Sequence, residues 1–181
     1  MTWQRIAKRI RVPLGFVFAI VFLWLARPTI TSMLVSLVLV LPGLWLRGYA
    51  SGYVKKNAEL AMTGPYAHTR NPLYLGSMMI AFGFALASMR WEVAVALAVL
   101  FLIIYLPTIR GEEAFLRSHF ASFDAYTRAV PRLFPRFTPA RLGAERGQFS
   151  KPLYMQHREY NALMGAAVLY VALLVRLFWH R

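Results

Sequence analysis

The sequence predicts an all-α integral membrane protein with about five transmembrane helices, formed by 181 residues in a single domain (1–181). The first observation is composition: 59% of the residues are apolar and the mean hydropathy is +0.48, above what a soluble domain carries. The second is that the apolar residues gather in five runs. The third is the absence of cysteine, which excludes disulfides, thiolate metal sites and iron–sulfur clusters.

The first two runs, residues 12–26 and 30–46, predict a helical hairpin because Arg27 and Pro28 turn the chain between them. Each run is shorter than the roughly 20 residues of a standard span, and snorkelling side chains at its ends lengthen it. The chain starts with basic residues, as a signal peptide does, but no small-residue cleavage site follows. Residues 47–62 mix charged and aromatic side chains, which predicts a helical extension of the second span into water.

The third and fourth runs, residues 73–87 and 93–109, predict a second hairpin with a tight turn between them. Pro107 stands near the end of the fourth run. One long polar segment, residues 110–160, follows. The fifth run, residues 161–179, predicts the final transmembrane helix.

The third run carries a row of small and apolar residues on one helical face, at Gly76, Ile80, Gly83 and Ala87. Small residues in such a row let two helices pack closely. They equally let a ligand approach the backbone. Packing is the favoured interpretation because it is the commoner use of such rows.

Basic residues are unevenly distributed between the predicted spans. With a cytoplasmic N-terminus, seventeen lysines and arginines fall in the inner segments and four in the outer segments. This bias predicts a cytoplasmic N-terminus and an outer C-terminus, and the expected location is a bacterial inner membrane. It also explains the net charge of +14, so membrane lipids are the expected partners. Nucleic acid is not an expected partner, since no soluble module with stacking aromatic residues is visible.

A polar stretch at residues 64–76 lies between the second and third spans and differs in kind from the apolar runs. Gly64-Pro65 predicts a turn, and Asn71-Pro72 predicts a helix start with Asn71 as its cap. The amides at a helix start are unpaired and carry the positive end of the helix dipole, so they suit a carboxylate or a ribose oxygen. The same stretch concentrates four larger polar side chains, Tyr66, His68, Arg70 and Tyr74.

Glu112 and Glu113 stand where the fourth span meets the cytoplasmic interface. Because the third and fourth spans form a hairpin, these glutamates are expected near Arg70, Asn71 and Tyr74. Ionisable groups at a membrane boundary are often functional. For Glu113 an alternative stays open, a helical ion pair with the residue four positions on, Arg117.

Together these residues resemble a known family. The chain is similar to the isoprenylcysteine carboxyl methyltransferase and phospholipid methyltransferase families at Gly64-Pro65-Tyr66, the run from Arg70 to Gly76, Glu112-Glu113, Phe120, Tyr126, and the run from Val130-Pro131-Arg132 to Pro135. The resemblance spans residues 45–136, the catalytic core of those enzymes. One departure is Asn71, where the eukaryotic pattern usually has histidine.

The resemblance implies an S-adenosylmethionine cofactor in a cytoplasmic pocket and a substrate that enters from the bilayer. A glutamate suits the cofactor's ammonium, Arg70 and the amides of residues 71–74 suit its carboxylate, and Tyr66 or Tyr74 suits its sulfonium. The predicted cofactor-binding residues are therefore Tyr66, His68, Arg70, Asn71, Pro72, Leu73, Tyr74, Gly76, Glu112 and Glu113.

Two residues are predicted to act on the methyl acceptor. Arg132 would meet an acceptor carboxylate, with an ordinary lipid-headgroup contact as the alternative. An amine or phenol acceptor would need a base, and Glu112 is the predicted one, with His68 and His119 as the other nearby candidates. The expected acceptor is a lipid or isoprenoid with a carboxylate or amine at the cytoplasmic interface. No metal is expected, because the four histidines show no ligand spacing.

Two other functions remain open from the sequence. Membrane sterol and enone reductases carry a similar Arg-x-Pro-x-Tyr element and bind NADPH, although the glutamate pair argues against phosphate binding. A membrane scaffold without turnover would fit the helical layout but leaves the polar cluster unexplained.

Overall fold

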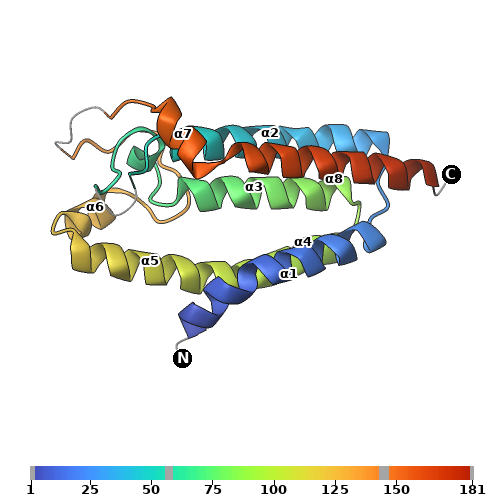
Figure 1. The fold of residues 1–181 in the computed structure, drawn as a ribbon, viewed down its shortest axis with the longest axis horizontal. Helices are drawn as coiled ribbons and strands as arrows, with labels where there is room; N and C mark the ends of the chain where they lie inside the picture. The colour runs from blue at the N-terminus through green and yellow to red at the C-terminus, as the bar shows by residue number, and fades with distance from the viewer. Residues whose placement is uncertain (1–2, 56–58, 143–146, 180–181) are drawn as a thin grey trace.

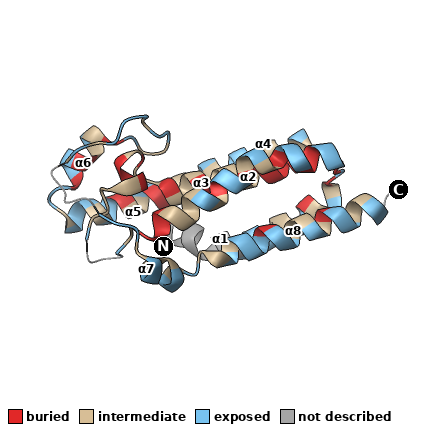
Figure 2. Cartoon of the chain, turned by 90° about the horizontal axis from the view of Figure 1, so that it is seen from above, coloured by how far each residue is buried: buried red, intermediate tan, exposed pale blue. Residues whose placement is uncertain are grey.

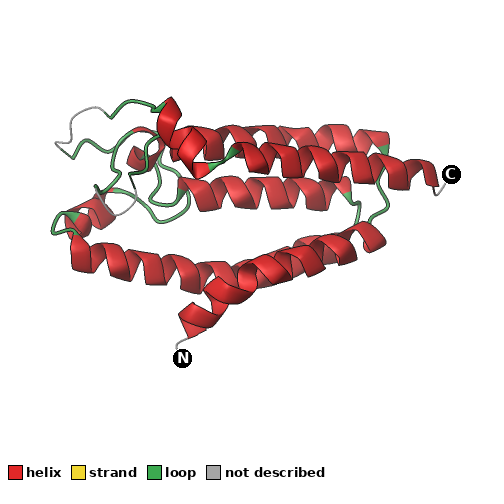
Figure 3. Cartoon of the chain, in the orientation of Figure 1, coloured by secondary structure: helices red, strands yellow, loops and turns green. Residues whose placement is uncertain are grey.

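The computed structural model describes residues 3–55, 59–142 and 147–179, with the backbone alone for residues 3–12. Regular structure in these residues is entirely helical (Figure 3). The long helices are α1 (Trp3–Leu25), α2 (Ile30–Ser51), α3 (Pro72–Ala87), α4 (Trp91–Leu100), α5 (Leu106–His119) and α8 (Tyr160–Trp179). The short elements are the 3-10 helix η1 (Gly64–Ala67), the π-helix η2 (Phe101–Tyr105), α6 (Phe123–Ala129) and α7 (Lys151–His157).

Three helices of the described chain are long and apolar enough to cross a membrane: Ile30–Ser51, Trp91–His119 and Tyr160–Trp179. Two shorter apolar helices, Pro13–Leu25 and Pro72–Ala87, accompany them. All five predicted apolar runs are therefore helical, and the all-α membrane class is confirmed. That five helices cross the bilayer stays a prediction.

The long helices form a closed ring. α1 contacts α5 and α8, α8 contacts α2, α2 contacts α3, and α3 contacts α4. The chain connections divide between the two ends of this ring (Figure 1). η1, α6, α7 and the long loops gather at one end, called here the loop end, and the turns at residues 26–29 and 88–90 lie at the other, the turn end.

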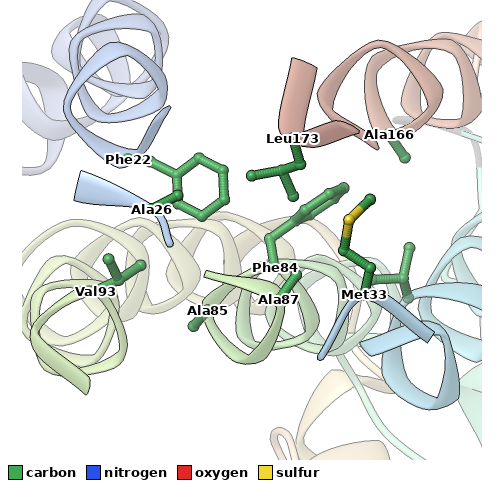
Figure 4. Close-up of a cluster of buried hydrophobic side chains, with 10 residues drawn as sticks. Phe22, Ala26, Met33, Phe84, Ala85, Ala87, Val93, Ala166 and Leu173 are labelled. Atoms are coloured by element: carbon green, nitrogen blue, oxygen red, sulfur yellow. The ribbon is translucent and has the colours of Figure 1, made fainter. Parts of the chain in front are cut away.

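The interior of the ring is apolar. Phe22 of α1, Met33 of α2, Phe84 of α3 and Leu173 of α8 are buried against one another (Figure 4). Many outward-facing side chains of the same helices are also apolar yet exposed, and Figure 2 shows exposed residues along α1 and α8. An apolar exterior around an apolar core is what a lipid environment requires.

The glycine row of α3 faces α2. A Cβ on Gly76 would lie 2.8 Å from the Gly43 carbonyl oxygen, and a Cβ on Gly83 would lie 2.5 Å from a methyl group of Val40. Only glycine permits backbones to approach this closely. The interpretation of the row as a packing face is confirmed.

One predicted boundary is wrong, and one helix is longer than the apolar run that it carries. α2 ends at Ser51, so residues 52–55 and 59–62 do not extend it, and residues 56–58 lie outside the described part of the chain. Gly52 follows at the helix end, and the Phe149 ring lies 2.4 Å from where its Cβ would be, so an aromatic side chain covers this turn. The helix that carries the fourth run continues past Pro107 and Ile109, to His119. In η2 the backbone widens to a π turn, with the Leu106 N–H donating to the Phe101 carbonyl, directly before the proline.

Candidate functional site

The polar stretch begins with the predicted turn. Gly64 adopts a positive φ of 58° and precedes Pro65 at the start of η1. A Cβ on Gly64 would lie 2.5 Å from the Tyr53 ring, so both its conformation and its neighbour require glycine.

The segment 131–140 lies along the polar stretch and is fastened to it by backbone hydrogen bonds. The Arg70 N–H donates to the Pro131 carbonyl at 2.9 Å, and the Arg136 N–H donates to the His68 carbonyl at 3.0 Å. The Nδ1 atom of His68 lies 2.8 Å from the Arg136 carbonyl. His68 therefore holds this loop in place.

Two buried tyrosines support the same region. The Tyr126 hydroxyl donates to the Tyr66 carbonyl at 2.8 Å. Burial raises the pKa of both phenols above their ordinary value. Both therefore stay neutral at physiological pH, and Tyr126 remains a hydrogen-bond donor.

α3 starts at Pro72 with Asn71 at the N-cap position, as predicted, but the Asn71 side chain does not cap the helix. The Asn71 side chain donates to the Arg132 carbonyl at 2.9 Å. It makes no capping hydrogen bond to α3. Asn71 instead ties the helix start to segment 131–140, and the first turn of α3 keeps its positive dipole end without a side-chain cap.

An ionic cluster forms around Glu113, which is 7% exposed. Its Oε2 accepts from the Arg132 Nε at 3.0 Å and lies 2.8 Å from an Arg132 terminal nitrogen. Its Oε1 lies 3.4 Å from a terminal nitrogen of Arg70. Arg117 pairs instead with Asp124 at 2.8 Å, so the alternative of a helical pair between residues 113 and 117 is wrong.

Two atoms of this cluster lack a hydrogen-bond partner among the described residues: Arg70 Nε and Glu113 Oε1, both buried. Burial lowers the pKa of Arg70, and the charge of Glu113 opposes that shift. Arginine stays charged in proteins despite such shifts. Because unsatisfied buried polar atoms are costly, this pair has capacity for a ligand with both a positive and a negative group.

Glu112 lies one position earlier on α5 and contacts the first turn of α3. Its Oε1 accepts a hydrogen bond from the Tyr74 hydroxyl at 3.1 Å. The Tyr74 ring also packs edge-on against Tyr105, with ring centres 5.9 Å apart. The predicted convergence of the third and fourth spans at this end is therefore confirmed.

These side chains line one pocket of about 490 Å³, within the usual size range of small-molecule sites. Eight predicted residues line it: Tyr66, Arg70, Asn71, Pro72, Leu73, Tyr74, Glu112 and Glu113. Three predicted residues lie outside its lining. His68 holds the loop, Gly76 packs against α2, and Arg132 reaches the pocket only through Glu113.

The remaining lining of the pocket was not among the predicted site residues, although Tyr126 belongs to the family resemblance. It comes from the loop after α2, with Leu60, and from α5 and α6, with Phe115, Leu116, Phe123 and Tyr126. The spacing of Leu116, Phe120 and Phe123 at i, i+4 and i+7 was the signal that could have found part of it.

A second, apolar pocket of about 120 Å³ lies between α1, α3 and the α4–η2 helix. Its walls include Phe18, Met78, Leu97 and Ile104. Tyr74 lines both pockets, so its ring lies at their boundary.

Arg47 of α2 was also missed as a supporting residue. It binds both carboxylate oxygens of Glu159, with the closest nitrogen–oxygen distance 2.7 Å, and it donates to the Leu73 carbonyl and the Ser77 hydroxyl of α3. The pair is mostly buried, with side-chain exposures of 23% and 12%. Arg47 therefore joins α2, α3 and the start of α8 beneath the site.

Comparison with known proteins adds an independent observation. A family model described as phospholipid methyltransferase matches residues 30–122. The nickel-cobalt-cadmium resistance protein NccN of Alcaligenes xylosoxydans xylosoxydans is 33% identical over 116 residues, covering 64% of this chain and 54% of that protein. The cobalt-zinc-cadmium resistance protein CzcN of Cupriavidus metallidurans is 34% identical over 116 residues, covering 64% and 53%. The match thus extends over about half the length of these relatives, and no solved structure matches the chain.

Proposed function

Because the chain belongs to the phospholipid methyltransferase family, we propose that it is a membrane enzyme that transfers a methyl group from S-adenosylmethionine to an amphiphilic acceptor. The acceptor would be a lipid or isoprenoid with a carboxylate or an amine. One observation carries the proposal: a half-buried arginine and a buried glutamate, each with a buried atom that lacks a hydrogen-bond partner, line one pocket beside the start of α3.

The residues present fit the cofactor. Arg70 Nε would donate to its carboxylate, and Glu113 Oε1 would accept from its ammonium. Arg132 occupies Glu113 Oε2, which leaves Oε1 for that role. Tyr66 or Tyr74 offers an aromatic face to a sulfonium. When bound, S-adenosylmethionine supplies an electrophilic methyl group.

The boundary position of Tyr74 supports an acceptor that enters from the bilayer. The apolar pocket would hold the acceptor's chain, and Tyr74 and Glu112 would border its polar end. A carboxylate acceptor needs no base, whereas an amine needs one, and Glu112 is the nearest carboxylate on this boundary. Excluding water favours methyl transfer to an anion, because opposite charges are neutralised in the reaction. Arg132 contacts Glu113, so we assign it a positioning role alongside the predicted contact with an acceptor carboxylate.

Calorimetry on the purified protein tests the cofactor. S-adenosylmethionine should bind and NADPH should not; the reverse result would favour a reductase, and binding of neither would favour a scaffold. Methyl transfer to a prenylcysteine analogue, phosphatidylethanolamine and a short water-soluble acid tests the acceptor. Activity confined to the water-soluble acid would rule out entry from the bilayer.

The names of the relatives raise a second question, because both are called metal resistance proteins. The described residues contain no group of three or more histidine, aspartate or glutamate side chains that could hold a metal ion. If this chain shares such a role, we propose that it acts by methylating an acceptor. Metal tolerance of cells carrying Glu113→Gln, compared with wild type, would show whether the role depends on the site.

We also propose a cytoplasmic N-terminus in a bacterial inner membrane, with the pocket facing the cytoplasm, which supplies the polar cofactor. The basic asymmetry of the sequence supports this orientation. Reporter fusions at Gly147 and at Arg181 should fall on opposite sides of the membrane. Finding both on one side would refute it.

A further inference from the structure

A large pocket lies at the turn end, opposite the candidate site. Its volume is about 690 Å³. The end of α1, the turn at residues 26–29, the turn at residues 88–90 and the end of α8 all contribute to its lining. Three arginines from these separate elements line it, Arg27, Arg90 and Arg176.

The three guanidinium groups differ in their hydrogen-bond and ion-pair partners. Arg176 donates to the carbonyls of Trp24 and Ala26 and thereby caps the end of α1. Arg90 pairs with Glu92 at 2.8 Å, but its Nε is buried without a hydrogen-bond partner in the described chain. Glu92 does not line the pocket.

Arg27 is the least engaged of the three. Its side chain is exposed and has no hydrogen bond or ion pair with any described residue. The pocket therefore offers donors from Arg27 and from Arg90 Nε, with a net positive charge that Glu92 only partly offsets.

The distribution of charge makes this cluster unusual. Only four of the 21 lysines and arginines belong to the predicted outer segments, and three of those four line this pocket. Tryptophans mark the same end, since Trp24, Trp91 and Trp179 are 73%, 74% and 83% exposed. Exposed tryptophan is typical of the membrane–water interface, where lipid headgroups lie.

From these observations we propose that the turn-end pocket binds a phosphate group, either that of an anionic phospholipid headgroup or a free phosphate ion. Arginine suits this ligand because its planar guanidinium donates paired hydrogen bonds to phosphate oxygens. Arg27 and Arg90 would bind the phosphate, and Arg176 would hold α1 in place beside it. This site is separate from the methyl-transfer pocket at the loop end.

The test measures binding of phosphatidylglycerol in mixed micelles and, separately, of inorganic phosphate to the purified full-length protein. The double variant Arg27→Gln/Arg90→Gln should bind its ligand on the order of tenfold more weakly than wild type. The control, Arg110→Gln/Arg128→Gln, removes two exposed arginines of the loop end and should bind as wild type does. If the double variant does not fold, Arg27→Gln alone should show a smaller loss in the same direction.

The two arms separate the sources of phosphate. Arginine-dependent binding of the lipid but not of inorganic phosphate assigns the site to a headgroup, and the opposite pattern assigns it to the free ion. Equal affinity of wild type and the Arg27→Gln/Arg90→Gln variant in both arms would overturn the proposal. An equal loss of affinity in the control variant would also overturn the proposal, because the effect would then come from the overall charge of the protein.

Discussion

α2 and α3 pack tightly against each other, whereas α1 is loosely packed around Gly15. α2 and α3 approach backbone to backbone, since a Cβ on Gly43 would lie 2.8 Å from the Gly76 carbonyl oxygen. On α1, a Cβ at Gly15 would meet nothing within 4 Å, and Gly15 lines apolar pockets of about 120 and about 340 Å³. The residues proposed to bind the cofactor precede the tightly packed α3, whereas α1 borders the space proposed for the acceptor.

This difference suggests a division of labour. A cofactor with several charged groups needs donors and acceptors fixed in place, which close packing provides. An acceptor with a flexible chain needs room, which the loosely packed side provides. Four substitutions test whether the two sides differ in this way.

The largest effect is expected from Arg47→Met, which removes the cation joining α2, α3 and Glu159. The Glu159 carboxylate, 12% exposed, would lose its partner, and unfolding free energy in detergent should fall by about 3 kcal/mol. Adding Glu159→Met should recover much of this loss, because no unpaired charge is left buried. The matched control Arg117→Met breaks an exposed pair and should cost less than about 1 kcal/mol. Equal losses in the two single variants would show that the Arg47 pair is not structurally special.

The second effect concerns binding on the packed side. Glu113→Gln keeps the shape of the side chain but removes its charge, so affinity for S-adenosylmethionine should fall about ten- to hundredfold, or about 1.5–3 kcal/mol, by calorimetry. Glu112→Gln should also weaken binding, by less, because Glu113 Oε1 is the atom without a partner. Asp124→Asn, an exposed carboxylate nearby, is the control. Wild-type affinity in both glutamate variants would place the cofactor elsewhere.

Features of this site could be predicted from the sequence where the interacting residues are close along the chain or lie on adjacent spans. The turn at Gly64, the helix start at Pro72 and the approach of Arg70 to Glu113 were predicted, because they depend on local turn chemistry and on a hairpin of adjacent spans. The partner of Glu113 that was missed, Arg132, belongs to a segment whose position depends on backbone hydrogen bonds to the polar stretch.

The errors in the helices have the same origin. Residues 47–62 have a helix-like pattern, but the chain leaves α2 at Gly52, where Phe149 from a distant segment packs. The fourth apolar run ends at residue 109, near Pro107, but the π turn before the proline lets the helix continue to His119. Periodicity and propensity do not encode such long-range contacts, and the Arg47–Glu159 pair, 112 residues apart, is a further example.

The third prediction tests the packed interface itself. Gly76→Ala places a methyl group 2.7 Å from the Arg47 side chain and 2.8 Å from the Gly43 carbonyl oxygen, so α2 and α3 must separate. Unfolding free energy should fall by about 1–2 kcal/mol. Gly165→Ala on α8 is the control, since its Cβ would meet nothing within 4 Å and alanine is the better helix former. A loss at Gly165 as large as that at Gly76 would mean that close approach does not explain the glycine row.

The smallest effect is expected on the loosely packed side, from Gly15→Leu. The new side chain would enter open space and occupy part of the apolar pocket of about 120 Å³, so stability should change little. The KM for a long-chain acceptor should rise several-fold, because a hydrophobic pocket discriminates by about 1–3 kcal/mol per methylene excluded and part of the chain can still lie in the bilayer. Affinity for S-adenosylmethionine should not change, since Gly15 does not line the polar pocket. A shorter-chain acceptor should be less affected, which separates loss of space from general damage. If Gly15→Leu weakens cofactor binding and leaves the acceptor KM unchanged, the assignment of the two pockets is wrong.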